Sequence, residues 1–259
     1  VARHRRAFGS TIDAFPLMRR QLMKIMLPTE QALSMAMWSA ATMGRADKGD
    51  RAAADLLRIL TPVFKYRACR DNIRVASHAL EVRGGVGYIE EWVNARLVRD
   101  AQIGTIWEGT SSINALDVVS RAVGKSHGHR VMQDALADML GKAADLPGQF
   151  RGQLNAAIGR AADFAERVAA DPALENRSRL AAGGLYHAAT AALLAAEGAA
   201  LGARGGDARR LLLARLVLEH RLTAQDPFSL AKNDWEDKAT GLLLSDRPVA
   251  LQAAQSLVA

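Results

Sequence analysis

The chain has 259 residues, of which 49% are hydrophobic and 24% charged, enough for one large domain or two modest ones with a sizeable core. No apolar run approaches the roughly 20 residues that cross a bilayer, and no signal-type segment follows the basic start, so we expect a cytoplasmic protein without a membrane span. The net charge of +7 lies mostly in residues 1–120, which hold 17 basic and 12 acidic residues and suit nucleic acid or a phosphate-bearing small molecule. Because residue 1 is not methionine, we expect a piece of a longer protein.

Apolar residues recur at helical spacing over the first third of the chain. The spacing predicts two long helices, over 14–46 and 50–82, the second capped by an aspartate at 47 or 50. Pro28 predicts a kink in the first helix. The periodicity continues through Pro62, which predicts a bend there and not an end.

The next segment alternates breaks and short helices. RGGVGY, residues 83–88, holds three glycines in four positions and predicts a loop. A short helix is expected over 92–100, and the hydroxyls of residues 110–112 can cap a further helix. Glu108 is therefore expected at a turn just before a helix N-terminus.

From about Gly124 the composition shifts to alanine-rich helical stripes, the last beginning near Asp207 and ending near Leu222. The final segment, 245–259, fits a docked helix or a frayed tail. No segment shows the alternation of a strand. The sequence therefore predicts an all-α fold, with an antiparallel helical bundle over 1–123 and a helical extension over 124–259. The single cysteine, Cys69, is expected to be a small packed residue.

Three segments can carry chemistry, and each also has an ordinary structural explanation. RHRRAFG, residues 3–9, reads as a solvated basic helix end. GGVGY fits a tight turn, or a place where bare backbone approaches a ligand. Glu108 fits an acid that is stabilised near a helix N-terminus. It also fits a general base in a poorly hydrated pocket, since Ile106 and Trp107 precede it and Gly109 allows close approach.

Taken together, these segments resemble the C-terminal helical part of the acyl-CoA dehydrogenase family. RRAFG resembles the family's R-x-x-F-G segment. Residues 79–113 are similar, in order and spacing, to the signature G-G-x-G-[FY], R-D-A and I-[YW]-E-G-T. The resemblance covers about residues 3–123.

The resemblance implies a flavoenzyme that uses FAD to remove an α-proton and a β-hydride from an acyl-CoA. Glu108 would be the catalytic base, beside a substrate-binding Gly109. Arg99 and Asp100 would be a structural pair. The cofactor contacts would come from three motifs: Arg5 and Phe8, reaching FAD on a neighbouring subunit; Glu81, Gly84 and Gly85; and Thr110 and Ser112.

The resemblance also implies partners and missing parts. The partners would be a second copy in a homodimer or homotetramer and an electron acceptor such as an electron-transfer flavoprotein, with no metal. The family's N-terminal helical and β-barrel domains are absent, so the isolated piece is expected to be inactive. Glu81 and Ser112 stand where many members have glutamine, and Ala7 lacks the polar side chain often found there, which puts those contacts in doubt.

Two alternatives remain open. One is a DNA-binding flavoprotein of the family's alkylation-response branch, but residues 121–259 hold 17 basic and 15 acidic residues, a small excess for DNA binding. A local patch of Arg204, Arg209, Arg210 and Arg215 fits DNA or an ordinary solvated helix face. The other is a degenerate member that serves in assembly.

Overall fold

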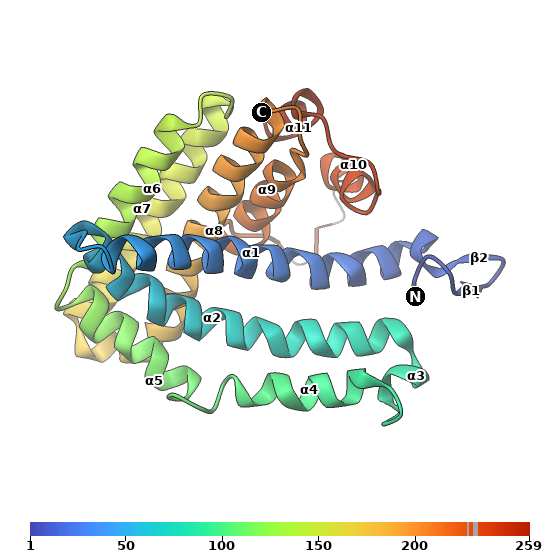
Figure 1. Cartoon of the computed structure of the whole chain (residues 1–259), viewed down its shortest axis with the longest axis horizontal. Coiled ribbons are helices and arrows are strands. Elements are labelled where there is room, and N and C mark those ends of the chain that lie inside the picture. Colours follow the sequence, from blue (N-terminus) through green and yellow to red (C-terminus); the bar gives the residue numbers. More distant parts are fainter. Residues whose placement is uncertain (227, 230–232) are drawn as a thin grey trace.

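Two long antiparallel helices form the axis of the fold, and shorter helices pack around them (Figure 1). A computed structural model describes residues 1–226, 228–229 and 233–259. The elements are, in chain order, β1 (Arg6–Ala7), β2 (Ser10–Thr11), the 3-10 turn η1 (Ile12–Ala14), α1 (Pro16–Ala46), α2 (Arg51–Arg83), α3 (Gly85–Tyr88), α4 (Val93–Ile103), α5 (Ser111–Leu116), the π-helix η2 (Asp117–Val123), α6 (Gly128–Lys142), α7 (Gly148–Ala170), the 3-10 helix η3 (Pro172–Arg177), α8 (Ser178–Ala203), α9 (Arg209–Leu222), α10 (Asp234–Leu243) and α11 (Leu251–Val258). The predicted all-α class is confirmed.

The two long helices match the sequence pattern closely. Pro28 lies inside α1 and Pro62 inside α2, and neither ends its helix. Asp50 caps α2, because its side chain accepts a hydrogen bond of 3.1 Å from the backbone N–H of Ala53.

The N-terminal segment forms a small hairpin, so its interpretation as a helix end was wrong. β1 pairs with β2 through Arg6 opposite Thr11 and Ala7 opposite Ser10. The connecting residues, Phe8 and Gly9, have φ angles of 48° and 84°. A two-residue loop with both φ angles positive suits the right-handed twist of paired strands, which explains why the chain reverses here.

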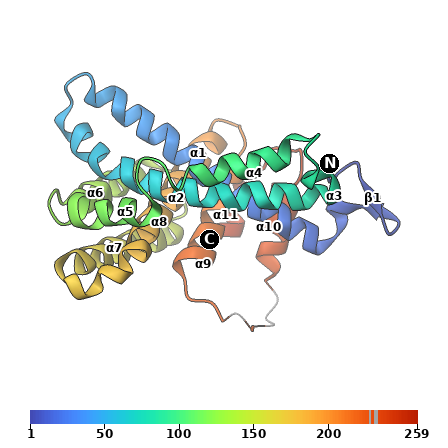
Figure 2. The same ribbon diagram turned by 90° about the horizontal axis from the view of Figure 1, so that it is seen from below.

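The RGGVGY segment contains one helical turn, α3, where a loop was predicted. Gly84 has φ 64° and ψ −147°, a conformation almost restricted to glycine. At Gly87 a Cβ atom would lie 2.4 Å from the carbonyl oxygen of Leu80, so only glycine fits. The turn reverses the chain so that α4 returns alongside α2 (Figure 2).

The extension packs around α8, which is buried on nearly every side. Such a helix must be apolar all round, which matches its alanine-rich sequence. Asp207 accepts hydrogen bonds from the N–H groups of Arg209 and Val249, both 3.0 Å, and so joins the start of α9 to the C-terminal segment. That segment is a docked helix, α11, with Ala254 and Val258 buried.

One cluster of buried apolar side chains runs through both halves of the chain, from Leu27 to Val258. Buried polar contacts also cross between the halves: the Gln31 amide donates to the Thr190 hydroxyl over 2.6 Å, and the Tyr66 hydroxyl donates to the Arg179 carbonyl over 3.0 Å. The division at 123/124 stays a prediction. Within the described residues, none of the helices combines the length and apolar character that a membrane span requires.

Candidate functional site

Glu108 lies in a series of turns between α4 and α5, with its backbone in the left-handed region. Its φ is 53°, and that of the following Gly109 is 92°. Left-handed backbone costs an ordinary residue about 1–2 kcal/mol, and such residues concentrate at functional sites. Among the described residues, three non-glycine residues have positive φ, namely Phe8, Glu108 and His127, and the first two are predicted site residues.

Lys65 of α2 anchors the loop that carries Glu108. Its ammonium Nζ donates to the carbonyl oxygen of Gly104 over 3.0 Å, lies 5.8 Å from the ring centre of Trp107, and lies 3.6 Å from Oε2 of Glu108. The sequence analysis missed Lys65, because nothing in the pattern of α2 connects it with a loop 39 residues later.

Asn114 holds the other side of the loop, where its amide donates to the carbonyl of Gly109 over 2.7 Å. The Glu108 side chain is 78% exposed and lies at the edge of an open groove of about 580 Å³ between α2, the loop and the start of η2. The poorly hydrated setting expected for this carboxylate therefore stays a prediction, since residues of this chain leave it open to water. Beneath the loop, Cys69 packs against Gly104.

The two predicted hydroxyl contacts behave differently. Thr110 occupies the N-cap position of α5, as expected, but its exposed side chain makes no capping hydrogen bond. The Ser112 hydroxyl accepts a hydrogen bond of 2.8 Å from the guanidinium of Arg179, at the start of α8. The Thr110 hydroxyl is thus available to a ligand, whereas the Ser112 hydroxyl already forms a hydrogen bond within the chain.

A second group of predicted residues gathers where the hairpin meets the α2–α3 turn. Arg5 Nη1 donates to the carbonyl of Arg83 over 3.0 Å, across 78 positions of sequence. A Cβ atom at Gly84 would lie 3.0 Å from the same nitrogen. A Cβ atom at Gly85 would meet nothing within 4 Å, so the backbone at that glycine is open to an approaching ligand.

Phe8 and Glu81 lie at the same end of the molecule. The Phe8 side chain is 97% exposed, and its ring meets Phe15 edge to face at 6.2 Å. Glu81 accepts a short hydrogen bond from the Gln21 amide and lies 3.6 Å from Nδ1 of His78. An aromatic ring so exposed on a strained hairpin turn contributes little to the fold of this chain.

The two groups are separated by the length of α4 (Figure 2). Eleven helical residues span roughly 16 Å. The structure therefore joins the R-x-x-F-G and G-G-x-G motifs but keeps both away from Glu108. On α4 itself, Arg99 pairs with Glu90 at 2.6 Å and lowers the pKa of that carboxyl, while Asp100 lies 3.4 Å from Arg96.

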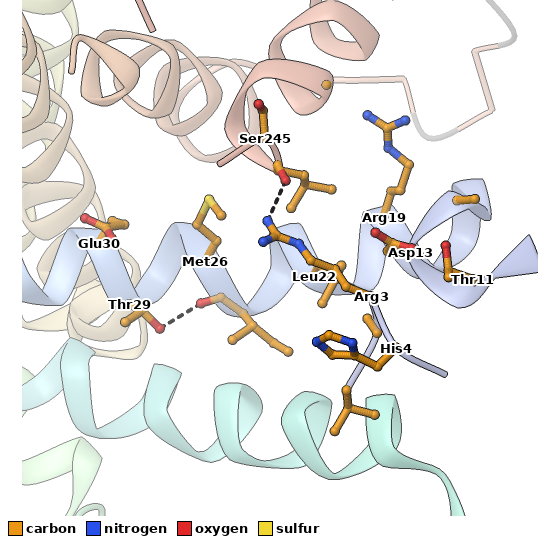
Figure 3. A pocket seen from close by; sticks show the side chains of 16 residues that line it. Arg3, His4, Thr11, Asp13, Arg19, Leu22, Met26, Thr29, Glu30 and Ser245 are labelled. Carbon is orange, nitrogen blue, oxygen red and sulfur yellow. Dashed lines mark hydrogen bonds between the residues drawn. The ribbon is translucent and has the colours of Figure 1, made fainter. Parts of the chain in front are cut away.

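A larger cavity, about 760 Å³, lies elsewhere, between the N-terminal segment, α1 and the end of α10 (Figure 3). Arg3 enters it but is engaged by Asp246 and by the Leu244 carbonyl. No predicted site residue lines this cavity. Its size alone does not connect it with the chemistry predicted for Glu108.

The arginines considered for DNA are mostly engaged within the chain. Arg210 bridges Glu30 and Glu197 at 2.8 and 2.7 Å, and Arg209 pairs with Asp207. Arg215 pairs with Glu219 at 2.8 Å and stacks on Trp235 at 4.1 Å. These contacts indicate a structural role for Arg209, Arg210 and Arg215.

Residues 1–124 match the model of the family described as acyl-CoA dehydrogenase, C-terminal domain. The chain is 34% identical over 122 residues to acyl-CoA dehydrogenase family member 11 of Caenorhabditis elegans, a match covering 46% of this chain and 20% of that protein. The chain thus spans only part of the length of this relative.

Two solved structures share the fold. The crystal structure of Caenorhabditis elegans ACDH-11 in complex with C11-CoA superposes with a TM-score of 0.76 at 21% identity, over 95% of this chain and 43% of that one. An acyl-CoA dehydrogenase from Bacillus anthracis complexed with FAD superposes with a TM-score of 0.67 at 17% identity, over 99% and 50% of the two chains. At these coverages both likenesses extend well beyond residue 124 into the helical extension.

Proposed function

Because residues 1–124 match the model of the acyl-CoA dehydrogenase C-terminal domain family, we propose that this chain is the C-terminal part of an FAD-dependent acyl-CoA dehydrogenase. The reaction is α,β-dehydrogenation of an acyl-CoA thioester. The observation that carries the proposal is the conformation of Glu108, which is held at positive φ between two fixed points, Lys65 and Asn114. Strain retained at an exposed acid supports a role beyond folding.

Glu108 takes the α-proton in this proposal. A thioester α-proton is weakly acidic, so the base must be close to it and water must be excluded. In this chain the carboxylate is 78% exposed, and water exclusion therefore requires another part of the enzyme to cover the groove. Gly109, without a side chain, lets the substrate approach the carboxylate.

The residues at the hairpin end fit a flavin nucleotide. Arg5 uses one nitrogen on the Arg83 carbonyl and keeps further N–H groups of its planar fork for phosphate oxygens. Gly85 leaves its backbone open, and Phe8 offers an exposed ring face. Bound FAD would supply the acceptor for the β-hydride. The Bacillus anthracis structure, which contains FAD, supports this cofactor.

The separation of the two groups supports an oligomer. Arg5 and Gly85 lie at one end of α4, and Glu108 and Thr110 at the other. We assign the first pair to the FAD of a neighbouring subunit and the second to the substrate side of its own active site. An acyl-CoA substrate is supported by the C11-CoA in the nematode structure.

The test is Glu108→Gln in the full-length flavoprotein loaded with FAD. Titration with acyl-CoA under anaerobic conditions should no longer bleach the oxidised flavin, while FAD stays bound, because glutamine keeps the shape but cannot accept the proton. Glu175→Gln, an exposed glutamate in η3, is the matched control and should bleach like the parent. Bleaching retained in Glu108→Gln would remove Glu108 from its role.

Nucleic-acid binding has a separate test. Binding to duplex DNA through phosphate contacts should weaken steeply with rising salt. With Arg209, Arg210 and Arg215 engaged internally, we expect no binding to duplex DNA even at low salt.

A further inference from the structure

A cleft of about 230 Å³ opens between α1, α9 and α10. Its walls include Arg20 and Lys24 of α1, His220 and Arg221 of α9, and Glu236 of α10. Arg20 and Lys24 are one helical turn apart and therefore share a face of α1, and His220 and Arg221 of α9 line the same opening. The groove at Glu108 reaches Ala46, at the far end of α1, so the two sites are distinct.

The cleft has more positive than negative charge. Its acid, Glu236, already accepts hydrogen bonds from His220 Nε2 at 3.0 Å and from Asn233 at 2.9 Å. These contacts, with the His220 hydrogen bond the largest cause, lower the pKa of Glu236 and keep it ionised. Within the described part of the chain, the side chains of Arg20, Lys24 and Arg221 have neither a hydrogen bond nor an ion pair.

Among these cations, Arg221 lies in surroundings that disfavour its positive charge. Burial lowers the pKa of its guanidinium, and the neighbouring cations Arg67 and Arg74 lower it further. The Asp71 carboxylate opposes that effect, but it already accepts two hydrogen bonds from Arg67, at 2.9 and 2.6 Å. Arg221 is nevertheless exposed at the surface, and an anion bound beside it would favour its charged form.

The floor of the cleft is apolar. Leu27 and Leu216 line it and are 8% and 3% exposed, and the flexible Met23 lies beside them. Pro28 also lines the cleft and has no N–H to donate to the carbonyl of Lys24. The volume falls below the roughly 300–1,000 Å³ of sites for drug-sized ligands, so the occupant is small.

We propose that this cleft binds a small amphiphilic anion, with its carboxylate or phosphate head on Arg221, Arg20 and Lys24 and a short aliphatic part on Leu27 and Leu216. The guanidinium fork of Arg221 matches either head group. Nothing in the proposed dehydrogenase reaction uses this cleft, so the two proposals stand independently.

The test is calorimetric titration of the whole 259-residue chain with four probes: hexanoate, acetate, butyl phosphate and inorganic phosphate. Each alkyl probe should bind more tightly than its short or inorganic counterpart, and whichever alkyl probe binds better identifies the head group. Arg221→Gln should weaken the better probe by about tenfold or more. Arg204→Gln, which removes an exposed arginine at the end of α8, should leave its affinity unchanged.

Lys24→Gln is a second variant, at an exposed position where the fold is not at risk, and it should weaken binding less than Arg221→Gln. Circular dichroism checks that both variants are folded. The proposal is overturned if no probe binds at concentrations up to about 10 mM, if Arg221→Gln and Arg204→Gln bind equally, or if the alkyl part brings no gain.

Discussion

At the scale of single residues, the loop that carries Glu108 depends on a side chain from another helix. Lys65 contacts Gly104, Trp107 and Glu108 of the loop, and its own side chain is only 19% exposed. The ion pair with the exposed Glu108 contributes little, because water screens it. The hydrogen bond to Gly104 and the contact with Trp107 are the stronger part of the anchor.

Replacing Lys65 by methionine should therefore loosen the loop while keeping its packing. We expect the free energy of unfolding to fall by about 1–2 kcal/mol and amide exchange to speed up over residues 104–109. Hydrogen exchange read by mass spectrometry measures both. Lys125→Met, at an exposed lysine, is the control, and equal exchange in the two variants would show that Lys65 does not anchor the loop.

The sequence predicted the identity of the candidate residues better than their surroundings. The motif pattern pointed to Glu108, Arg5 and Gly84, and the structure brings the last two into contact. It could not reveal Lys65, because a lysine on an amphipathic helix looks like a solvated charge. It also could not show that Ser112 is bound by Arg179, since that contact joins residues 67 positions apart.

At the scale of elements, helices with strong apolar periodicity were predicted to within a few residues. The segments that differ are the β1–β2 hairpin, the single turn α3, the π-helix η2, the 3-10 helix η3 and α10, for which no helix was predicted. Two-residue strands have no alternation to detect. The hairpin depends on Phe8 taking a positive φ, which residue propensity argues against.

Helix α8 offers a matched test of close packing. At Gly198 a Cβ atom would lie 2.5 Å from the backbone nitrogen of Leu211, whereas at Gly183 it would meet nothing within 4 Å. Gly198→Ala should destabilise the chain by about 1–3 kcal/mol, although alanine favours helix formation. Gly183→Ala should stabilise it by about 0.5–1 kcal/mol.

Denaturant titration of both variants measures these changes. The comparison is sensitive because the substitution and the helix are the same and only the neighbour differs. A similar shift in both would mean that α9 moves away freely and that the approach of α8 to α9 is not a constraint.

At the scale of the whole molecule, buried histidines link stability to pH. His129 is fully buried, and within the described residues neither ring nitrogen has a hydrogen bond. Burial lowers its pKa, the Arg130 cation lowers it further, and Glu166 opposes them. Burial also lowers the pKa of His187 well below its usual value.

Both histidines bind protons more readily in the unfolded chain, where the pKa of a histidine side chain is about 6.5. Stability is therefore complete above that pH and falls as pH drops below it toward the folded pKa, by at most about 1.4 kcal/mol per pH unit for each histidine. Denaturant unfolding at pH 7, 6 and 5 measures the slope. His129→Leu should reduce it, and a slope unchanged in that variant would exclude His129 as a contributor.

The buried contacts between the two halves of the chain have a consequence for its synthesis. Gln31 makes its buried hydrogen bonds with His187 and Thr190, which follow 156 and 159 residues later. A ribosome adding about 5–20 residues per second needs roughly 8–30 s to produce them. During that interval the inner face of α1 lacks its final neighbours, so the nascent chain depends on chaperones or on provisional contacts to avoid association with other chains.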